Sequence, residues 1–212
     1  MSGTALLVIH DVGDPKGGTR WRALTDAWPG DALAPDLPGH GETPPPTGAH
    51  YKAGDAAIAA WRAAEQAGIT NEDVSALGHG WGGFAAEVLA SAGRASRLVL
   101  VDGLGPPWQT FDDLVADRHR WLREVFADAE SLAPPSAIPD PRLAHTFPSV
   151  WDPTFIGNLR RSITVPVLAV ETPASPTPDP AERLADYAGP TTLLEVDSID
   201  AVTDALRESG WA

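Results

Sequence analysis

The stretch Gly78-His79-Gly80-Trp81-Gly82-Gly83 is the part of the sequence that is most informative about chemistry. It directly follows an apolar run and opens an amphipathic segment, so we expect a turn between a strand and a helix. Glycines permit such a tight turn, and the first backbone N–H groups of a helix favour a negative or polarised oxygen. The amide of Trp81 is therefore a candidate group for holding an anion or polarising a carbonyl.

The spacing of Gly78, Gly80 and Gly83 is similar to the Gly-x-Gly-x-x-Gly fingerprint of dinucleotide-binding proteins. Asp102 ends the next apolar run, where such proteins place an acid for the ribose. That fingerprint usually belongs to the first strand–helix unit, however, whereas here two units precede it. The bulky Trp81 also lies where the backbone should be bare against a pyrophosphate, so dinucleotide binding is the less favoured hypothesis.

A second resemblance covers nearly the whole chain. The turn is similar to the nucleophile elbow of the α/β-hydrolase family, where small residues flank a strained nucleophile. The resemblance implies an α/β-hydrolase-like fold, with a mostly parallel sheet and helices on both faces, that begins at the family's third strand. Further segments resemble the family in the same order: His10-Asp11-Val12-Gly13 leading through Gly17-Gly18 to Trp21, Pro35 to Thr43, Leu98 to Gly103, and Ile163 to Glu171.

The family's catalytic groups are missing from the matching positions. The elbow residue is Gly80, whereas the family has Ser, Asp or Cys there, activated by His and oriented by an acid. No Asp follows Glu171 at the expected distance, which leaves Glu171 as a weak substitute, and no His follows His145. The resemblance therefore implies a degenerate Ser-His-Asp triad. Ester hydrolysis should be nearly undetectable, since losing a triad costs on the order of a millionfold in turnover.

Two residues that border the pocket in the family layout, His10 and Asp11, are the tentative catalytic residues for acid–base chemistry. His10 is equally well read as hydrogen-bonded scaffold, and Asp11 as a solvated charge. A carboxylate at Asp11 would also oppose negative charge developing in an oxyanion hole. His79, Asp102 and Glu171 are weaker candidates, because His79 is expected to pack beneath the turn and Asp102 to cap one. The ligand pocket is expected at Trp81, Leu104 and Trp108, enlarged by the vacant position at Gly80.

The composition excludes several classes of partner. The 212 residues include 15 Lys or Arg and 29 Asp or Glu, a net charge of −14, which opposes binding to nucleic acid or an anionic membrane. The absence of Cys excludes disulfides and thiolate chemistry, and the His spacing has no metal-ligand pattern, so we expect no cofactor or metal. The early apolar run, Ala5 to Ile9, is too short for a signal or a membrane span, so we expect a cytoplasmic location.

Apolar runs alternate with amphipathic segments, a pattern typical of parallel strands joined by crossover helices. Clustered prolines between Asp102 and Val165 indicate an insertion that forms a small cap, with one helix near Phe111 to Ala127. We expect a single domain over residues 1–212, with its core at 1–104 and 160–212 and the cap at 105–159. The expected strands are Ala5–His10, Ala32–Asp36, Val74–Gly78, Arg97–Asp102, Val165–Glu171 and Thr191–Val196, and the expected core helices are Thr19–Ala27, Ala53–Gly68, Trp81–Ser91, Pro180–Ala188 and Ile199–Glu208.

Two local expectations concern the segment around the second strand. Asp36 and His40 are expected to stabilise the glycine-rich loop that follows it. The strand near Ala32 would be an uncovered sheet edge, so we expect a homodimer that covers it.

Together these features support an α/β-hydrolase-fold protein that binds a small, largely apolar, carbonyl-bearing ligand. Its chemistry would be non-covalent acid–base catalysis of the lyase, isomerase or cyclase type. A non-catalytic binding or scaffold protein on the same fold is the alternative, and fold analogy cannot choose between them. A dinucleotide-binding protein, or a hydrolase with a different nucleophile, is less favoured. Whether the chain is an enzyme is open at this stage, but if so it is not an ordinary serine hydrolase.

Overall fold

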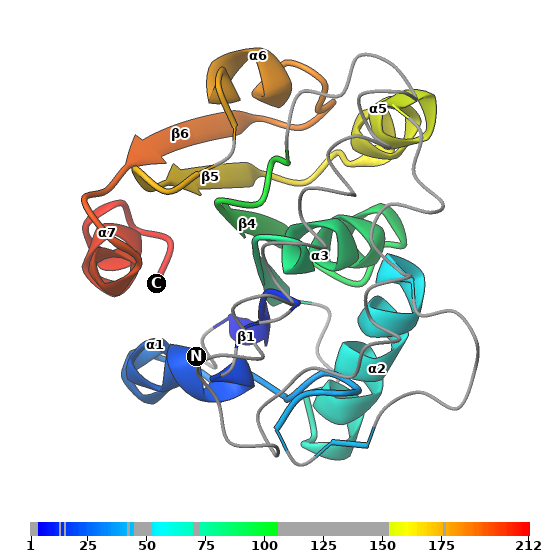
Figure 1. Cartoon of the computed structure of the whole chain (residues 1–212), viewed down its shortest axis with the longest axis vertical. Coiled ribbons are helices and arrows are strands. Elements are labelled where there is room, and N and C mark those ends of the chain that lie inside the picture. The colour runs from blue at the N-terminus through cyan, green and yellow to red at the C-terminus, as the bar shows by residue number, and fades with distance from the viewer. Residues whose placement is uncertain are drawn as a thin grey trace, which may run out of the picture.

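The apolar runs form one parallel sheet in the order β2-β1-β3-β4-β5-β6 (Figure 1). The computed structural model describes residues 4–12, 14, 16–41, 43–44, 52–69, 73–105, 153–175 and 177–212. The strands are β1 (Ala5–Ile9), β2 (Ala32–Leu33), β3 (Val74–His79), β4 (Arg97–Val101), β5 (Val167–Glu171) and β6 (Thr191–Glu195).

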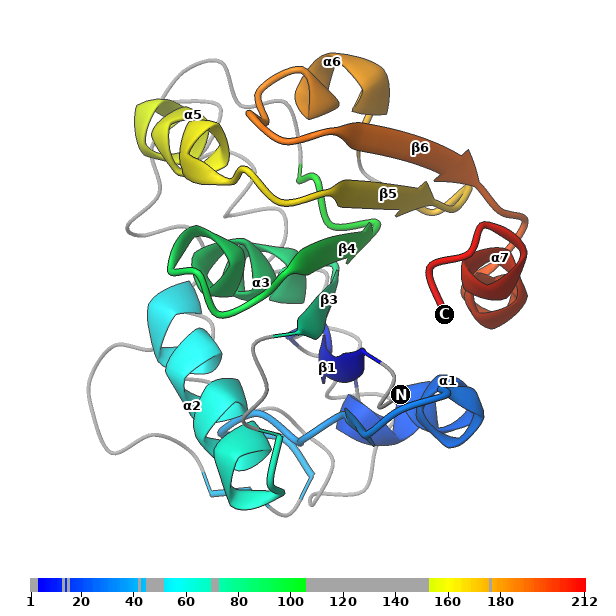
Figure 2. The ribbon, with the colours of Figure 1, turned by 180° about the vertical axis from the view of Figure 1, so that it is seen from behind.

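Helices connect the strands and cover both faces of the sheet (Figures 1 and 2). The helices α2, α3 and α5 pack on one face, and α1 and α7 pack on the other, so the molecule has three layers. The helices are η1 (Gly17–Trp21), α1 (Arg22–Ala27), α2 (Ala53–Gln66), α3 (Gly82–Ser91), α5 (Pro153–Ser162), α6 (Pro180–Leu184), η4 (Ile199–Ala201) and α7 (Val202–Glu208).

Successive side chains of β1 point to opposite faces of the sheet and so contribute to the hydrophobic core on both faces. Leu7 and Ile9 pack with α2 and α3, whereas Leu6 and Val8 pack with α1 and α7. All four side chains are buried, as expected for a parallel strand between two layers of helices. The fold class predicted from the sequence is confirmed by this layered sheet of six strands.

Three elements differ most from the sequence-based expectation. The strand β2 has only two residues, because Pro35 and Pro38 follow closely and have no backbone N–H for a sheet ladder. The helix α6 ends at Leu184, four residues before its predicted end, and the turn that follows leads into β6. The helix α5 was not predicted as an element, although its first residue, Pro153, suits a helix start. The helix predicted near Phe111 to Ala127 lies outside the described residues.

Candidate functional site

The carboxyl ends of four neighbouring strands bring the predicted site residues to one edge of the sheet. Asp11 lies just beyond β1, Gly80 follows β3, Asp102 follows β4, and Glu171 ends β5. Parallel α/β sheets place their ligand sites at this edge. Leu104, predicted as a pocket residue, is fully buried in the core on the α3 side, and Trp108 lies outside the described residues.

The turn at Gly80 has the geometry of a sharp strand-to-helix elbow. The backbone of Gly80 has a φ of +52°, in a region that residues other than glycine rarely adopt. Its N–H donates to the Val101 carbonyl at 2.9 Å, and its own carbonyl accepts from the N–H of Gly83 at 3.0 Å. A Cβ on Gly82 would come within 2.3 Å of the Ile9 carbonyl oxygen. The glycines are therefore required by the close approach of α3 to β1.

The carboxyl group of Asp11 occupies the space that a side chain on Gly80 would take. A Cβ built on Gly80 would lie 2.5 Å from Cγ of Asp11 and 2.6 Å from its Oδ1. Oδ1 accepts a hydrogen bond of 2.7 Å from the backbone N–H of Trp81, which begins the turn into α3. The Asp11 carboxyl group, which follows β1, thus occupies the place of an elbow side chain. It also accepts the hydrogen bond of the Trp81 N–H, the backbone donor that was expected to face a ligand.

The environment of Asp11 favours its neutral form. Burial raises the pKa of Asp11 to about 7, and the nearby Asp14 carboxylate adds to this rise. Backbone hydrogen bonds from Trp81 and Val12 act in the opposite direction and lower the pKa, as does the neighbouring His10. A carboxyl group with a pKa near 7 can both donate and accept a proton at neutral pH.

Both ring nitrogens of His10 form hydrogen bonds with the backbone. Nδ1–H donates to the Asp11 carbonyl at 2.7 Å, and Nε2 accepts from the N–H of Leu37 at 3.0 Å. Burial lowers the pKa of His10, and its ring meets that of His40 edge-on at 4.7 Å between centroids. Both ring nitrogens of a neutral imidazole are therefore used. Of the two interpretations of His10, this geometry favours a hydrogen-bonded scaffold, and a catalytic role for His10 stays a prediction.

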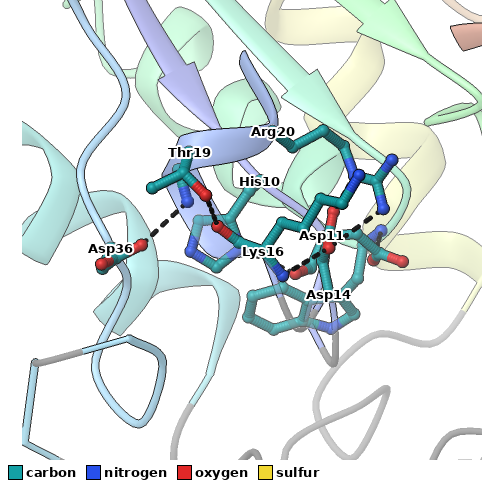
Figure 3. Close-up of polar contacts among 9 residues, drawn as sticks. His10, Asp11, Asp14, Lys16, Thr19, Arg20 and Asp36 are labelled. Atoms are coloured by element: carbon teal, nitrogen blue, oxygen red, sulfur yellow. Dashed lines mark hydrogen bonds and ion pairs between the residues drawn. The ribbon is translucent and has the colours of Figure 1, made fainter. Parts of the chain in front are cut away.

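The loop beyond β1 is held by two carboxylates (Figure 3). Asp36 accepts from the N–H of Gly18 at 2.8 Å, so it holds the loop after β1 rather than the loop after the second strand, for which it was predicted. Asp14 forms an ion pair with Arg20 and accepts from the N–H of Lys16 at 2.9 Å. Although burial opposes it, the hydrogen bond from Arg20 lowers the pKa of Asp14. Sequence reasoning missed the Asp14–Arg20 pair, whose only signal was two opposite charges six residues apart.

His79, a weaker candidate from the sequence, ends β3 next to the elbow. Its ring lies edge-on to that of Trp21, with 5.5 Å between centroids. Burial lowers the pKa of His79, while Asp102 and Asp14 raise it. Within the described part of the chain, Nδ1 of His79 is buried and has no hydrogen-bond partner.

The other two carboxyl groups at this edge differ in how they are satisfied. Asp102 accepts from the N–H and the hydroxyl of Thr172, both at 2.7 Å, and it has a positive φ of 48°. Glu171 is 7% exposed and accepts a short hydrogen bond from Ser175 at Oε2. Burial raises the pKa of Glu171 to about 7, with a contribution from Asp102. Asp102 is thus engaged in joining the ends of β4 and β5, whereas Glu171 retains a titratable carboxyl.

The described residues contain neither a metal-binding cluster nor a membrane-spanning helix. No group of three or more His, Asp or Glu side chains there is arranged to hold a metal ion. No helix in the same residues is long and apolar enough to cross a membrane.

Comparisons with known proteins agree on one fold. The family model described as "Alpha/beta hydrolase family" matches residues 6–211. A thermophilic esterase from Thermogutta terrifontis aligns with a TM-score of 0.74 at 19% identity, covering 98% of this chain and 89% of the other. The enol-lactonase from Burkholderia xenovorans gives 0.73 at 17% identity, with 98% and 91% covered. A hydrolase from Pseudomonas aeruginosa gives 0.69 at 19% identity, with 98% and 88% covered. No curated protein sequence matches the chain.

Proposed function

Because the chain belongs to the alpha/beta hydrolase family, we propose that it binds a small, largely apolar ligand with a carbonyl group and that Asp11 moves a proton on this ligand. The observation that carries the proposal is the position of the Asp11 carboxyl group, within 2.6 Å of where an elbow side chain would begin. The elbow itself supplies no nucleophile, since residue 80 is glycine, and no His follows His145. Proton transfer is the chemistry that remains available to these groups.

Asp11 is suited to act in both protonation states. Its Oδ1 is fixed by the Trp81 amide, so the carboxyl group has a defined orientation. When protonated, it can donate a hydrogen bond to the ligand carbonyl, in place of the backbone donor that it has taken. When ionised, it can remove a proton from the carbon next to that carbonyl. Lyase, isomerase and cyclase reactions all use such a step, and general acid–base groups typically contribute 10²- to 10⁴-fold in rate.

The experiment is proton–deuterium exchange at the carbon next to the carbonyl in a panel of small ketones, followed by NMR in D₂O. We expect exchange with the wild-type protein and a loss of about 100-fold in Asp11→Asn, which keeps the shape of the side chain. Asp26→Asn, an exposed Asp on α1, is the matched control and should exchange at the wild-type rate. Equal rates in wild type and Asp11→Asn would show that Asp11 does not carry the chemistry.

A second function is favoured by the same hydrogen bond. Because Asp11 already occupies the Trp81 amide at 2.7 Å, the site could be filled permanently, as in a non-catalytic binding or scaffold protein. Such a protein would show no exchange with any ketone, and Asp11→Asn would change only its stability. Clear turnover of p-nitrophenyl esters or labelling by a fluorophosphonate would contradict both functions, because it would require a different nucleophile.

A further inference from the structure

The strand β6 forms an open edge of the sheet. The order of the described strands ends at β6, which pairs with β5 on one side (Figure 1). The N–H of Val196 donates to the Glu171 carbonyl at 3.0 Å and so points towards β5. Because backbone groups alternate in direction along a strand, those of Thr191, Leu193 and Glu195 point away from β5. The N–H and carbonyl groups of these three residues, the open edge, can pair with another extended chain.

The two edges of the sheet differ in how far they resist such pairing. Edge strands in folded proteins are usually kept short or carry a proline or a lysine, which discourages another chain from pairing with them. β2 has two residues and is followed by Pro35 and Pro38. β6 has five residues, Thr-Thr-Leu-Leu-Glu, with neither proline nor lysine, and both threonines are exposed. Of the two edges, β6 is therefore the one suited to accept a further strand.

A groove of about 490 Å³ lies beside the open edge, between the carboxyl end of β6 and α7. Both views of the molecule place α7 next to that end of the strand (Figures 1 and 2). On the helix, the lining residues Asp204, Ala205 and Glu208 are close to one turn apart and share one face. On the strand side, Leu194 and Val196 line the groove and pack with the core layer of α1 and α7. The groove therefore lies on the α7 side of the sheet.

The charge of the groove indicates which kind of chain fits it. Four of the lining residues are acidic and none is basic, the four being Glu195, Asp197, Asp204 and Glu208. Asp204 has an exposed ion pair with Arg207 at 3.5 Å. A second copy of this chain would bring the same carboxylates and a net charge of −14, and like charges on neighbouring strands repel. A chain with positive charges is therefore the complementary occupant.

We propose that the open edge and this groove dock an extended peptide segment of another protein, with Lys or Arg at every second position. The segment adds as a further strand beside β6, and its backbone pairs with the open edge. Every second side chain of an added strand points to the same face of the sheet. On the α7 side these side chains enter the groove, where their methylene groups cover Leu194 and Ala205 and their cations meet the carboxylates. This docking does not depend on the function proposed for Asp11.

The first test measures the binding of a fluorescein-labelled hexapeptide of alternating Lys and Val by fluorescence anisotropy at 20 mM NaCl. The double variant Glu195→Gln with Glu208→Gln removes one carboxylate from each wall of the groove. The control, Asp26→Asn with Asp31→Asn, removes the same two charges from exposed positions on α1 and before β2. We expect the dissociation constant to rise about tenfold in the groove variant and to stay within about twofold in the control. Equal weakening in both would overturn the proposal, because the peptide would then follow the net charge alone.

The second test addresses the backbone pairing. Glu195→Pro removes the outward N–H together with the charge, whereas Glu195→Gln removes only the charge, so their difference isolates the hydrogen-bond donor. We expect Glu195→Pro to bind the peptide about fivefold more weakly than Glu195→Gln, at a similar melting temperature. In the wild type, the saturating peptide should slow hydrogen exchange of the Leu193 amide, which points outward, and leave that of Leu194, which points towards β5, unchanged.

Two results would overturn docking at the open edge. An unchanged exchange rate of the Leu193 amide under saturating peptide would show that no strand is added, whatever the affinity, and this measurement does not require Glu195→Pro to fold. A dimer of the wild type that Glu195→Pro abolishes in sedimentation would assign the open edge to a second copy of this chain instead.

Discussion

Asp11 and Gly80 share one position in space, although they are sixty-nine residues apart in the sequence (80 − 11). The glycine has no side chain to fill this space, and the Asp11 carboxyl group occupies it, 2.5 Å from where a Cβ on Gly80 would be. Neither residue, considered alone, would predict this arrangement. An Asp after the first strand would ordinarily be a surface charge, and a Gly at the elbow would leave a hole. The pair is consequently the unit that mutagenesis should address.

Adding a side chain at the elbow should destabilise the protein more when Asp11 is present than when Asp11 has been removed. Gly80→Ala introduces a Cβ that overlaps the carboxyl group, at a φ of +52° that itself strains alanine. We expect a cost of about 3 kcal/mol in unfolding free energy, falling to about 1 kcal/mol when Asp11 is also replaced by Gly. Urea denaturation of the two single variants and the double variant measures this difference. Strictly additive effects would contradict the shared position.

His40 gives a second test at the residue scale, through pH. Burial lowers the pKa of His40 to about 4, whereas an unfolded His titrates near 6.5. Below pH 6.5 the unfolded chain therefore binds a proton that the folded protein refuses, so this group removes stability as the pH falls towards 4. The loss contributed by His40 should reach about 2.5 kcal/mol at pH 4.5.

The titration of Asp11 changes the stability in the opposite direction as the pH falls. The variant His40→Gln is therefore needed to isolate the contribution of His40. Because its folded pKa is raised to about 7, Asp11 binds a proton in the folded state first and adds relative stability as the pH falls from 7. The two contributions partly cancel in the wild type. The stability of the wild type relative to His40→Gln should decline between pH 7 and 4.5 in urea titrations, and a constant difference would show that His40 titrates normally.

At the scale of elements, a buried ion pair joins α5 to α3. Arg160 of α5 donates from Nε to Glu87 of α3 at 2.9 Å and from Nη2 to the Leu104 carbonyl at 2.6 Å. Tyr187 donates to the same oxygen of Glu87. The Glu87 and Arg160 side chains are 0% and 2% exposed, so neither charge can turn to water. Leu104 lies near the end of one described stretch of the chain and α5 begins the next, and this cluster joins the two.

Breaking the pair on one side should cost far more than removing both charges. Arg160→Met leaves Glu87 buried without its cation, and we expect a loss of about 3–5 kcal/mol. The double variant Arg160→Met with Glu87→Leu should recover at least about half of that loss, because no uncompensated charge remains. Chemical denaturation provides the free energies. A double variant no more stable than Arg160→Met would mean that hydrogen bonds to Leu104 and Tyr187, rather than charge, dominate.

The elements could largely be predicted from the sequence, and the site only in part. Apolar runs placed β1, β3 and β4 to within a residue at each end, since these parallel strands are buried on both faces, and the exposed edge strand β6 was placed equally well. The helix α5 was not predicted, because the clustered prolines indicated a cap in which only one helix, near Phe111 to Ala127, could be located. That Asp11 lies near the elbow followed from the family layout. Its entry into the space at Gly80 did not, because this depends on the close approach of α3 to β1.

At the scale of the whole molecule, the sheet edges and the net charge decide whether two copies pair. The homodimer expected from the sequence was to cover the strand near Ala32, but β2 has only two residues there. Short edge strands offer little backbone for pairing with another chain. Each copy also carries a net charge of −14, and such like charges repel at low ionic strength.

We therefore predict that the protein is a monomer at 20 mM NaCl and that the folded monomer becomes more stable as NaCl is added. Raising NaCl to 500 mM shortens the screening length to about 4 Å, which weakens repulsion among the 29 acidic side chains within one copy. Sedimentation should report one species of 22.3 kDa at low salt, and thermal melts should shift upwards as salt is added. A dimer already present at 20 mM would mean that an interface other than the β2 edge overcomes the charge. In that case β6, five residues long and largely exposed, is the edge to block first with a proline at Glu195, whose N–H faces away from β5.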